Sequence, residues 1–524
     1  MSTTISRLLV ANRGEIAARI IRTCRTLGIE TVAVYSDADR DAAFVQLADV
    51  SVAIGGEAPA DSYLRSDVIV AAATQAGADA VHPGYGFLSE NAEFAQSVID
   101  AGLVFVGPRP QTIAAMGSKI EAKRLMADAG VPVLPSAELD GLDDAAVQAA
   151  IDGVGYPAMI KASAGGGGRG MRIVSDPSDV LEAVAGARRE ADAAFGDGTL
   201  FAERYVAPSR YVEVQIFGDH DGNVVHFHER ECSLQRRHQK VIEEAPSPSL
   251  DPTTRTALHE AAVRAGSALG YVNAGTVEFL LAPAVGAGSP EFFFLEVNTR
   301  LQVEHPVTEA ILGVDLVALQ LAVASGGALP DQAAIGAPRG HAIEARLYAE
   351  DPAAGFRPSI GELRSFAIGG PAHAAVRVDS GLAGGGVVSR HYDPMVAKVI
   401  AHAGSRDGAA RQLAGALRQA TIDGLVTNRA LLVRTLQHPE FLDGRADSAF
   451  FERNDPAALG APLVDGPDVA WYAAAAALAV QAYRRSTDRH TAGVSSGFRT
   501  VPTGPQRIAL VDPAGHEHRV SYRF

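Results

Sequence analysis

The first hundred residues alternate short apolar runs with helical stretches, and this alternation restricts the fold more than any other feature. Apolar runs of strand length occupy residues 7–12, 31–36, 80–84 and 104–107. Helical stretches separate them, one beginning near Glu15 and the others near residues 66–76 and 90–101. Such alternation predicts an α/β domain in which helices cover a parallel sheet. The first strand is not followed by G-x-G-x-x-G, so the pattern does not indicate a dinucleotide-binding fold.

Residues 161–174 read KASAGGGGRGMRIV, with four consecutive glycines between two apolar segments. Glycine loses more backbone freedom on folding than any other residue, so such a run needs a compensating role. Backbone N–H groups without side chains approach anions closely, which suits a loop over phosphate groups. A plain hairpin loop or a linker is the alternative. Strands are predicted on both sides of the glycines, at residues 156–162 and 170–174, so the segment should form a hairpin. Because it also lacks GxxxxGK[ST], any phosphate would be covered by a flap and not held at a helix N-terminus.

The stretch EVNTRLQVE, residues 296–304, places hydrogen-bonding side chains at every second position. In an extended chain these would share one face, while Val297, Thr299, Leu301 and Val303 would pack on the core. A solvated sheet face is the alternative, but such faces usually carry Lys, Thr and Ser. The order acid, amide, cation, amide, acid therefore predicts a ligand platform formed by Glu296, Asn298, Arg300, Gln302 and Glu304.

Glu278 lies on the strand predicted before this platform. Two carboxylates on neighbouring strands and one amide oxygen are the hard donors that Mg²⁺ takes when it is also bound to nucleotide phosphates. We therefore expect Glu278, Glu296 and Asn298 to be metal ligands; a surface position for Glu278 is the alternative.

The basic cluster QRRHQK, residues 235–240, stands out in an acidic chain and suits an anion, as do Lys119 and Lys161. The alternative is a solvated turn. No Ser-His-Asp triad, cysteine nucleophile or zinc-binding spacing is visible in the sequence. His226 and His228, on a strand with alternating polarity, are expected to be structural groups and not ligands.

Length and composition bound the class of protein. The 524 residues, 47% hydrophobic and 20% charged, indicate a globular protein of roughly three to four domains. The formal charge of −15 argues against a general nucleic-acid-binding protein. No signal-peptide pattern is present, and the longest apolar run, residues 469–480, is shorter than the about 20 residues that span a bilayer. With two cysteines in no metal-ligand spacing, we predict a cytoplasmic protein without membrane or nucleic-acid partners.

Seven stretches, in order, together resemble the biotin carboxylase family, the ATP-grasp component of biotin-dependent carboxylases. They are LLVANRGEIAARIIR, HPGYGFLSEN, MGSKIEAKRLM, KASAGGGGRGMRIV, ECSLQRRHQKVIEEAPSP, EVNTRLQVEHPVTE and GHAIEARLYAEDP. The resemblance covers roughly residues 5–450. It implies an N-terminal parallel-sheet domain, an ATP-grasp domain with a glycine-rich lid, a mixed α+β C-terminal domain, and then a helix and the start of an incomplete β domain. The expected bounds are residues 5–118, 119–330 with the lid at about 135–203, 338–450 and 465–524.

The resemblance also implies a role for each matching residue. Contacts to ATP would come from Lys119, Lys161, Gly165, Gly166, Gly167, Gly168, Glu203, Arg204, Tyr205, Val206, Tyr211 and His238. Mg²⁺ or Mn²⁺ would be bound by Glu278, Glu296 and Asn298. Bicarbonate would be held by Lys240, Arg300, Gln302 and Val303, with Glu304 as general base and Arg346 stabilising the biotin enolate. The family often has histidine where this chain has Tyr211, which leaves only that nucleotide contact in question.

The implied activity is the ATP- and Mg²⁺-dependent carboxylation of biotin by bicarbonate through carboxyphosphate. The biotin-accepting sequence Ala-Met-Lys-Met, or a similar one, is absent, so we expect either a truncated chain or biotin on a separate carrier protein. The tail resembles α subunits of acyl-CoA carboxylases, of the 3-methylcrotonyl-CoA, propionyl-CoA or acetyl-CoA type, which implies a carboxyltransferase β subunit and a homo- or hetero-oligomer. Two alternatives remain: another ATP-grasp carboxylate ligase, and a non-catalytic assembly subunit of a carboxylase.

Overall fold

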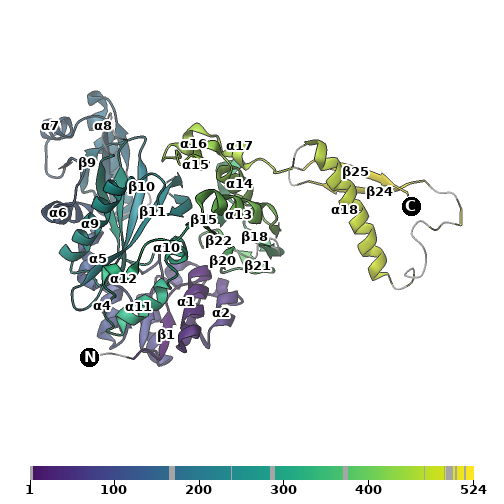
Figure 1. Ribbon diagram of the computed structural model, residues 1–524, viewed down its shortest axis with the longest axis horizontal. Coiled ribbons are helices and arrows are strands. Elements are labelled where there is room, and N and C mark those ends of the chain that lie inside the picture. Colours follow the sequence, from purple (N-terminus) through teal and green to yellow (C-terminus); the bar gives the residue numbers. More distant parts are fainter. Residues whose placement is uncertain are drawn as a thin grey trace. The chain divides into compact units, whose positions relative to one another are not determined.

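The computed structural model describes most of the chain, which divides into two compact units, Met1–Gly460 and Ala461–Phe524 (Figure 1). The described residues are 4–163, 171–237, 239–283, 290–369, 376–464, 466–488, 490, 498, 500–501, 504–512 and 515–523.

The first unit begins with the parallel sheet that the sequence predicts. Its strand order is β3-β2-β1-β4-β5, and all four strand pairs are parallel. The strands are β1 (Arg7–Val10), β2 (Glu30–Tyr35), β3 (Val50–Ala53), β4 (Ala80–His82) and β5 (Val104–Phe105). The helices between and after them are α1 (Gly14–Leu27), α2 (Ala43–Leu47), α3 (Ser66–Gln75), α4 (Ala92–Asp100) and α5 (Pro110–Gly117). Strand β3, which the sequence analysis did not predict, is short and has no fully buried residue.

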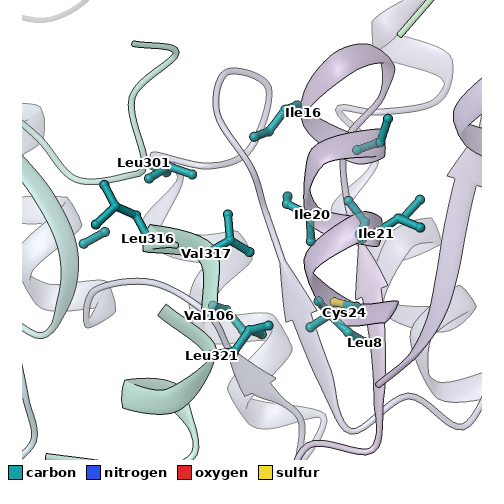
Figure 2. Packing of buried hydrophobic residues seen from close by; sticks show 14 of the residues in the cluster. Leu8, Ile16, Ile20, Ile21, Cys24, Val106, Leu301, Leu316, Val317 and Leu321 are labelled. Atoms are coloured by element: carbon teal, nitrogen blue, oxygen red, sulfur yellow. The ribbon is translucent and has the colours of Figure 1, made fainter. Parts of the chain in front are cut away.

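A hydrophobic core joins this sheet to a segment nearly three hundred residues later (Figure 2). Leu8 of β1 and Ile16, Ile20 and Cys24 of α1 belong to the same buried cluster as Leu301 and three residues of helix α11 (Leu316–Ala324): Leu316, Val317 and Leu321. Leu301 is completely buried. The apolar side of the predicted ligand platform is thus anchored in the core, as expected for Leu301.

An eight-stranded antiparallel sheet forms the centre of the unit, in the order β14-β13-β10-β11-β12-β15-β22-β20. Its strands are β10 (Arg210–Gly218), β11 (Val224–Arg236), β12 (Gln239–Ala245), β13 (Asn273–Leu281), β14 (Phe292–Asn298), β15 (His341–Tyr348), β20 (Arg377–Ser380) and β22 (Met395–Ala403). Helices α6 (Lys119–Asp128), α9 (Pro252–Ala268) and α10 (His305–Leu312) belong to the same region. The sheet runs from the segment predicted as the ATP-grasp domain into the segment predicted as the C-terminal domain.

A smaller four-stranded sheet, in the order β6-β9-β7-β8, carries the glycine-run hairpin. Its elements are β6 (Ser136–Glu138), α7 (Asp144–Val154), β7 (Ala158–Ala162), β8 (Arg172–Val174), α8 (Val180–Phe195) and β9 (Leu200–Arg204). Strands β7 and β8 pair antiparallel, with Ala158 opposite Val174, so the predicted hairpin is confirmed. The four glycines at its tip, Gly165, Gly166, Gly167 and Gly168, lie outside the described residues.

The extended run predicted for residues 296–304 was too long. Strand β14 ends at Asn298, and helix α10 begins at His305 with Pro306 in its first turn. Proline suits the first helical turn because its fixed φ is helical and its missing N–H has no helical partner there. The chain therefore leaves the sheet before Glu304, and strict alternation does not extend across the whole platform.

The rest of the first unit consists of short helices and two-stranded sheets. The helices are α12 (Gln332–Ile335), α13 (Arg406–Arg418), α14 (Arg429–Leu436), α15 (Pro439–Leu442), α16 (Phe450–Arg453) and α17 (Pro456–Gly460). The paired strands are β16 (Glu350–Asp351) with β17 (Arg357–Pro358), β18 (Gly361–Leu363) with β21 (Gly386–Val388), and β19 (Ser365–Ala367) with β23 (Thr421–Asp423).

The second unit contains helix α18 (Gly466–Thr487) and one hairpin, β24 (Gln506–Val511) with β25 (Glu517–Tyr522). The resemblance implied a helix and the start of a β domain in residues 465–524, and both kinds of element occur there. Among the described helices, none is individually long and apolar enough to cross a membrane; only α10 and α11 taken together, bent by 97°, meet that criterion of length and composition.

Candidate active site

Most of the predicted site residues line one cavity of about 1240 Å³ in the first unit. Both sheets and the loops that follow β1 and β4 contribute to its lining. The predicted residues in the lining are Lys119, Lys161, Glu203, Arg204, Tyr205, Val206, Tyr211, Lys240, Glu278, Glu296, Asn298, Arg300, Gln302, Val303 and Arg346. Glu304 is fully buried and is not part of the lining. His238, like the four glycines, lies outside the described residues.

The carboxylate of Glu304 is held between two cations. Lys240 of β12 donates from Nζ to Oε1 at 2.6 Å, and Arg346 of β15 donates from a terminal nitrogen to Oε2 at 3.0 Å. Burial by itself raises the pKa of a carboxyl group, but Lys240, Arg346 and Arg230 hold the pKa of Glu304 well below its usual range. Glu304 is therefore a fixed, ionised carboxylate.

Lys240 faces more than one carboxylate. Its Nζ also lies 2.5 Å from Glu213 Oε2 and 3.0 Å from Glu278 Oε1. Glu213 is further bonded at 2.5 Å by the fully buried Arg230. Even so, burial, together with the nearby charge of Glu304, raises the pKa of Glu213 to about 7. The site thus holds several acidic groups that share few cations, and an added divalent cation would lower their repulsion.

Arg300 is fixed by four hydrogen bonds around its guanidinium. It donates to Glu90 Oε2 at 2.9 Å, to Gln302 Oε1 at 2.8 Å, to Asn298 Oδ1 at 3.0 Å and to the carbonyl oxygen of Leu301 at 3.3 Å. Arginine suits planar anions because its donors lie in one plane. The guanidinium is held in the cavity lining close to the residues predicted to bind bicarbonate.

The three predicted metal ligands lie on adjacent strands. Glu278 of β13 is directly opposite Glu296 of β14, and Thr276 is opposite Asn298. Glu278 Oε1 accepts from Asn298 Nδ2 at 2.8 Å and from Gln302 Nε2 at 3.1 Å, so Glu278, Asn298 and Gln302 form one hydrogen-bonded group. Two carboxylates and one amide oxygen fit Mg²⁺ or Mn²⁺, whose other ligands would be phosphate oxygens and water.

The cations predicted to contact phosphate lie near Glu203. Lys161 of β7 forms an ion pair with Glu203 Oε1, and Lys123 of α6 donates to Glu203 Oε2 at 2.5 Å. Although burial opposes ionisation of Glu203, these two lysines hold the pKa of its carboxyl group below the usual value. Lys119 lies one turn before Lys123 on α6, and burial lowers its pKa. The three lysines form a positive end of the cavity that suits a polyphosphate.

The segment predicted to hold the adenine follows the end of β9. Tyr205 and Val206 lie just after the strand, and the backbone N–H of Tyr205 donates to the carbonyl oxygen of Pro157 at 2.9 Å. Tyr211 also lines the cavity, and burial raises its pKa to about 12, so its phenol remains protonated. Apolar and aromatic groups at this end of the cavity suit a purine ring.

Val303 departs from the alternation expected for residues 296–304. It was expected to pack on the core, but it lines the cavity because the strand has already ended. Its carbonyl oxygen accepts from the fully buried Lys398 Nζ at 2.8 Å, and the same nitrogen lies 3.1 Å from Glu15 Oε1. The backbone at Val303 is thereby tied to helix α1 of the first sheet. Glu304 was expected on the platform face, but it occupies the N-cap position of α10 instead.

Several residues around the site were not predicted from the sequence. Lys123 could have been found because it is four residues after Lys119 on a predicted helix, where both side chains share a face. The others depend on strand register or long-range packing, which the sequence does not give. They are Glu90, Glu213, Arg230, Glu243 and Lys398.

Three family models match consecutive parts of the chain. Residues 4–113 match the biotin carboxylase N-terminal domain, residues 118–332 the ATP-binding domain of the carbamoyl-phosphate synthase L chain, and residues 344–453 the biotin carboxylase C-terminal domain.

Curated relatives match the same region. A biotin carboxylase of Halalkalibacterium halodurans is 49% identical over 444 residues, 85% of this chain and 96% of the relative. The mitochondrial methylcrotonoyl-CoA carboxylase subunit alpha of Oryza sativa subsp. japonica is 49% identical over 449 residues. That match spans 86% of this chain but only 60% of the relative.

Solved structures agree with the sequence matches. A Campylobacter jejuni biotin carboxylase in a β,γ-ATP complex is similar with a TM-score of 0.82 and 42% identity, covering 86% of this chain and 99% of that one. The biotin carboxylase domain of Hydrogenobacter thermophilus 2-oxoglutarate carboxylase, in complex with MgADP, ADP and bicarbonate, is similar with a TM-score of 0.83 and 38% identity. It covers 88% of this chain and 100% of that one.

Proposed function

This chain belongs to the biotin carboxylase family, and we propose that its cavity carries out the ATP-dependent carboxylation of biotin by bicarbonate. The observation that carries this proposal is the placement of Glu304 between Lys240 and Arg346, beside Arg300. A buried base and two cavity cations suit a small oxyanion that must lose a proton before it attacks phosphorus.

At the nucleotide end, Lys119 and Lys161 contact the ATP phosphates, and residues 203–206 with Tyr211 hold the adenine. Arg204, Tyr205 and Val206 supply the strand end and the apolar wall, while Glu203 orients Lys161. By resemblance to the family, the ATP-binding residues also include Gly165, Gly166, Gly167, Gly168 and His238. Cations placed around transferring phosphate oxygens stabilise the charge that develops there.

Glu278, Glu296 and Asn298 hold Mg²⁺ or Mn²⁺. Three observations support the assignment: their hard oxygen donors, the hydrogen bond from Asn298 to Glu278 Oε1, and the position of Glu296 directly opposite Glu278. The bound cation would neutralise charge on the phosphate oxygens.

At the other end, Lys240, Arg300, Gln302 and the backbone at Val303 bind bicarbonate. An anion between Lys240 and Arg300 competes with Glu304 for positive charge, and this raises the pKa of Glu304 toward a range in which it accepts a proton. Glu304 then takes the bicarbonate proton, and a bicarbonate oxygen attacks the γ-phosphorus of ATP. The products of this step are ADP and carboxyphosphate.

Carboxyphosphate breaks down to CO₂ and phosphate within the closed cavity. Phosphate takes the N1 proton of biotin, and the nitrogen forms a bond to the carbon of CO₂. Arg346 stabilises the negative charge on the ureido oxygen of biotin. Its position, 2.5 Å from Glu243 Oε1 and 3.0 Å from Glu304 Oε2, keeps its guanidinium fixed at the cavity wall.

The partners of this activity follow from the relatives. This chain spans about 60% of the length of the methylcrotonoyl-CoA carboxylase α subunits that it matches. We infer that biotin reaches the cavity on a carrier domain or carrier protein, and that a carboxyltransferase β subunit takes the carboxyl group to an acyl-CoA. The assembly is then a homo- or hetero-oligomer.

Formation of carboxybiotin tests the proposal. Purified protein is incubated with Mg-ATP, isotopically labelled bicarbonate and free biotin, and the acid-labile label on biotin is measured. Label transfer that depends on ATP supports the proposal. ATP hydrolysis without transfer to biotin would favour another ATP-grasp ligase, and no ATP binding would favour an assembly subunit.

A further inference from the structure

Three histidines from two elements of the first unit gather outside the cavity. His226 and His228 lie on β11, and His259 lies on α9. One possible ligand nitrogen of each lies within 4.8 Å of those of the other two, and none of the three residues lines the cavity. The activity proposed above gives this cluster no role.

A β-bulge gives the strand histidines their arrangement. In the pairing of β10 with β11, Val214 is opposite Glu229, whereas Ile216 is opposite His226. One residue of β10 therefore faces two residues of β11, and His228 has φ 62, a left-handed conformation uncommon for a residue with a side chain. Bulges redirect side chains, and here both His226 and His228 reach the ring of His259.

Hydrogen bonds at Nε2 of two rings leave their Nδ1 nitrogens available. His228 Nε2 lies 2.9 Å from the carbonyl oxygen of Gly336, and His259 Nε2 lies 2.6 Å from Glu229 Oε2. A carbonyl oxygen and a carboxylate only accept, so each Nε2 carries the hydrogen and each Nδ1 presents a lone pair. This pattern, an imidazole oriented by an oxygen acceptor on its far side, is typical of metal-binding histidines.

The ring of His226 is held by few hydrogen bonds among the described residues and can serve as the third ligand. Its backbone is held by Gln332 of α12, which accepts from the N–H at 2.8 Å and donates to the carbonyl oxygen at 3.0 Å. Its ring makes one long hydrogen bond, in which Nδ1 accepts from the backbone N–H of His228 at 3.3 Å. Binding a cation through the ring of His226 would give up that single long bond.

An acidic side chain beside the cluster favours a cation there. Glu229 supplies a negative charge behind His259, shared with Arg255 at 2.9 Å.

We propose that His226, His228 and His259 bind one zinc ion, which ties strand β11 to helix α9. Imidazole nitrogens suit Zn²⁺, and three protein ligands leave a fourth position for water. Zinc–nitrogen bonds of about 2.0–2.1 Å need closer nitrogens than the present separations of up to 4.8 Å. The partly exposed side chains of His226 and His228 supply this adjustment by turning about their χ angles. This proposal differs from the expectation, drawn from the sequence, that these two histidines are structural.

The test uses untagged, chelator-treated full-length protein with saturating Mg²⁺, so that the sites of the main cavity are occupied. Zn²⁺ stoichiometry is measured by equilibrium dialysis, and Co²⁺ is used as a spectroscopic probe because tetrahedral Co²⁺ absorbs strongly in the visible range. The variants are His226→Ala and His228→Asn, since asparagine tolerates the left-handed backbone of residue 228. His220→Ala, an exposed histidine outside the cluster, is the matched control.

Wild type and the control should bind one zinc ion more than the two variants, or bind it at least about tenfold more tightly. Zinc should raise the unfolding temperature of wild type and control and have a smaller effect on the variants. Equal zinc binding by wild type and both variants would overturn the proposal. Because the variants leave the main cavity intact, biotin-dependent ADP release should be unchanged in all of them. The outcome is therefore independent of the proposed carboxylation.

Discussion

Lys240 Nζ and Glu304 Oε1 lie 2.6 Å apart, although one residue is on the central sheet and the other is the N-cap residue of helix α10. The second oxygen of Glu304 is bonded by Arg346 at 3.0 Å. Both cations favour the ionised form, so the structure keeps a carboxylate charged in a fully buried position. The predictions below follow from this arrangement and from its surroundings.

Glu304→Gln should lower kcat for bicarbonate-dependent ADP release by roughly 10²- to 10⁴-fold, the usual contribution of general-base catalysis. The substitution keeps the shape of the side chain but removes its proton-accepting charge. ATP affinity, measured separately with a fluorescent analogue, should change little because Glu304 does not line the cavity. Near-normal turnover in this variant would exclude Glu304 as the base.

Lys240→Met should move the acidic limb of the pH profile of kcat/KM to higher pH. Lys240 lowers the pKa of Glu304, so its removal raises that pKa, and the base becomes protonated at a higher pH than in wild type. Lys119→Met is the matched control, since it removes a cavity cation at the phosphate end and should lower activity without moving this limb. An acidic limb at the same pH in both variants would contradict the assignment.

Glu296→Gln should raise the Mg²⁺ concentration needed for half-maximal activity by about tenfold or more. The substitution replaces one of two carboxylates in the proposed metal site by a neutral amide, which binds a hard cation less strongly. Glu291→Gln, which changes an exposed acid just before the same strand, should leave the Mg²⁺ requirement unchanged. Equal Mg²⁺ dependence in the two variants would argue against Glu296 as a ligand.

Glu344→Gln should increase the free energy of unfolding near pH 7 and make it less dependent on pH. Both carboxyl oxygens of Glu344 are buried without a hydrogen-bond partner among the described residues. Burial raises its pKa well above the usual value, against the opposing effect of Lys398. A raised folded-state pKa means that stability is fully present below the unfolded-state pKa and is lost as pH rises from there toward the folded-state pKa.

Glutamine removes this loss of stability, and we expect the free energy of unfolding near pH 7 to rise by about 1 kcal/mol. Chemical denaturation at several pH values measures it, with the exposed Glu362→Gln as control. A variant that is less stable than wild type at neutral pH would show that Glu344 is ionised and favourably placed.

Gly166→Val combined with Gly167→Val should raise KM for ATP by about tenfold or more without unfolding the protein. Valine side chains in the glycine run would keep backbone N–H groups away from the phosphates of ATP. Circular dichroism and thermal unfolding provide the control for folding. An unchanged KM for ATP would exclude the glycine run from nucleotide binding.

The sequence predicted those parts of the fold that depend on local pattern. Alternation of strand and helix predicted the parallel sheet, and the glycine run between two strands predicted a hairpin, in which Ala158 pairs with Val174. The end of β14 was missed because Pro306 marks the start of a helix, while the polar alternation before it continues unchanged through Glu304. Pattern alone does not show where an extended chain leaves its sheet.

Most of the residues predicted for the site line the cavity, but the residues that hold them in place were not predicted. Arg300 and Gln302 were assigned from the platform sequence, but Glu90, which bonds Arg300 at 2.9 Å, is 210 residues away in the chain. Similarly, Glu213 contacts Lys240 through strand pairing that becomes visible only in three dimensions. His259 joins His226 and His228 for the same reason, because a helix packs over the strand.

ADP release from the purified chain tests the proposed biotin carboxylation most directly. It is measured with Mg-ATP, first without and then with bicarbonate, and finally with free biotin at high concentration. We expect little ADP release without bicarbonate, release when bicarbonate is present, and a further rise with biotin. ATP binding without any effect of bicarbonate or biotin would contradict this proposal.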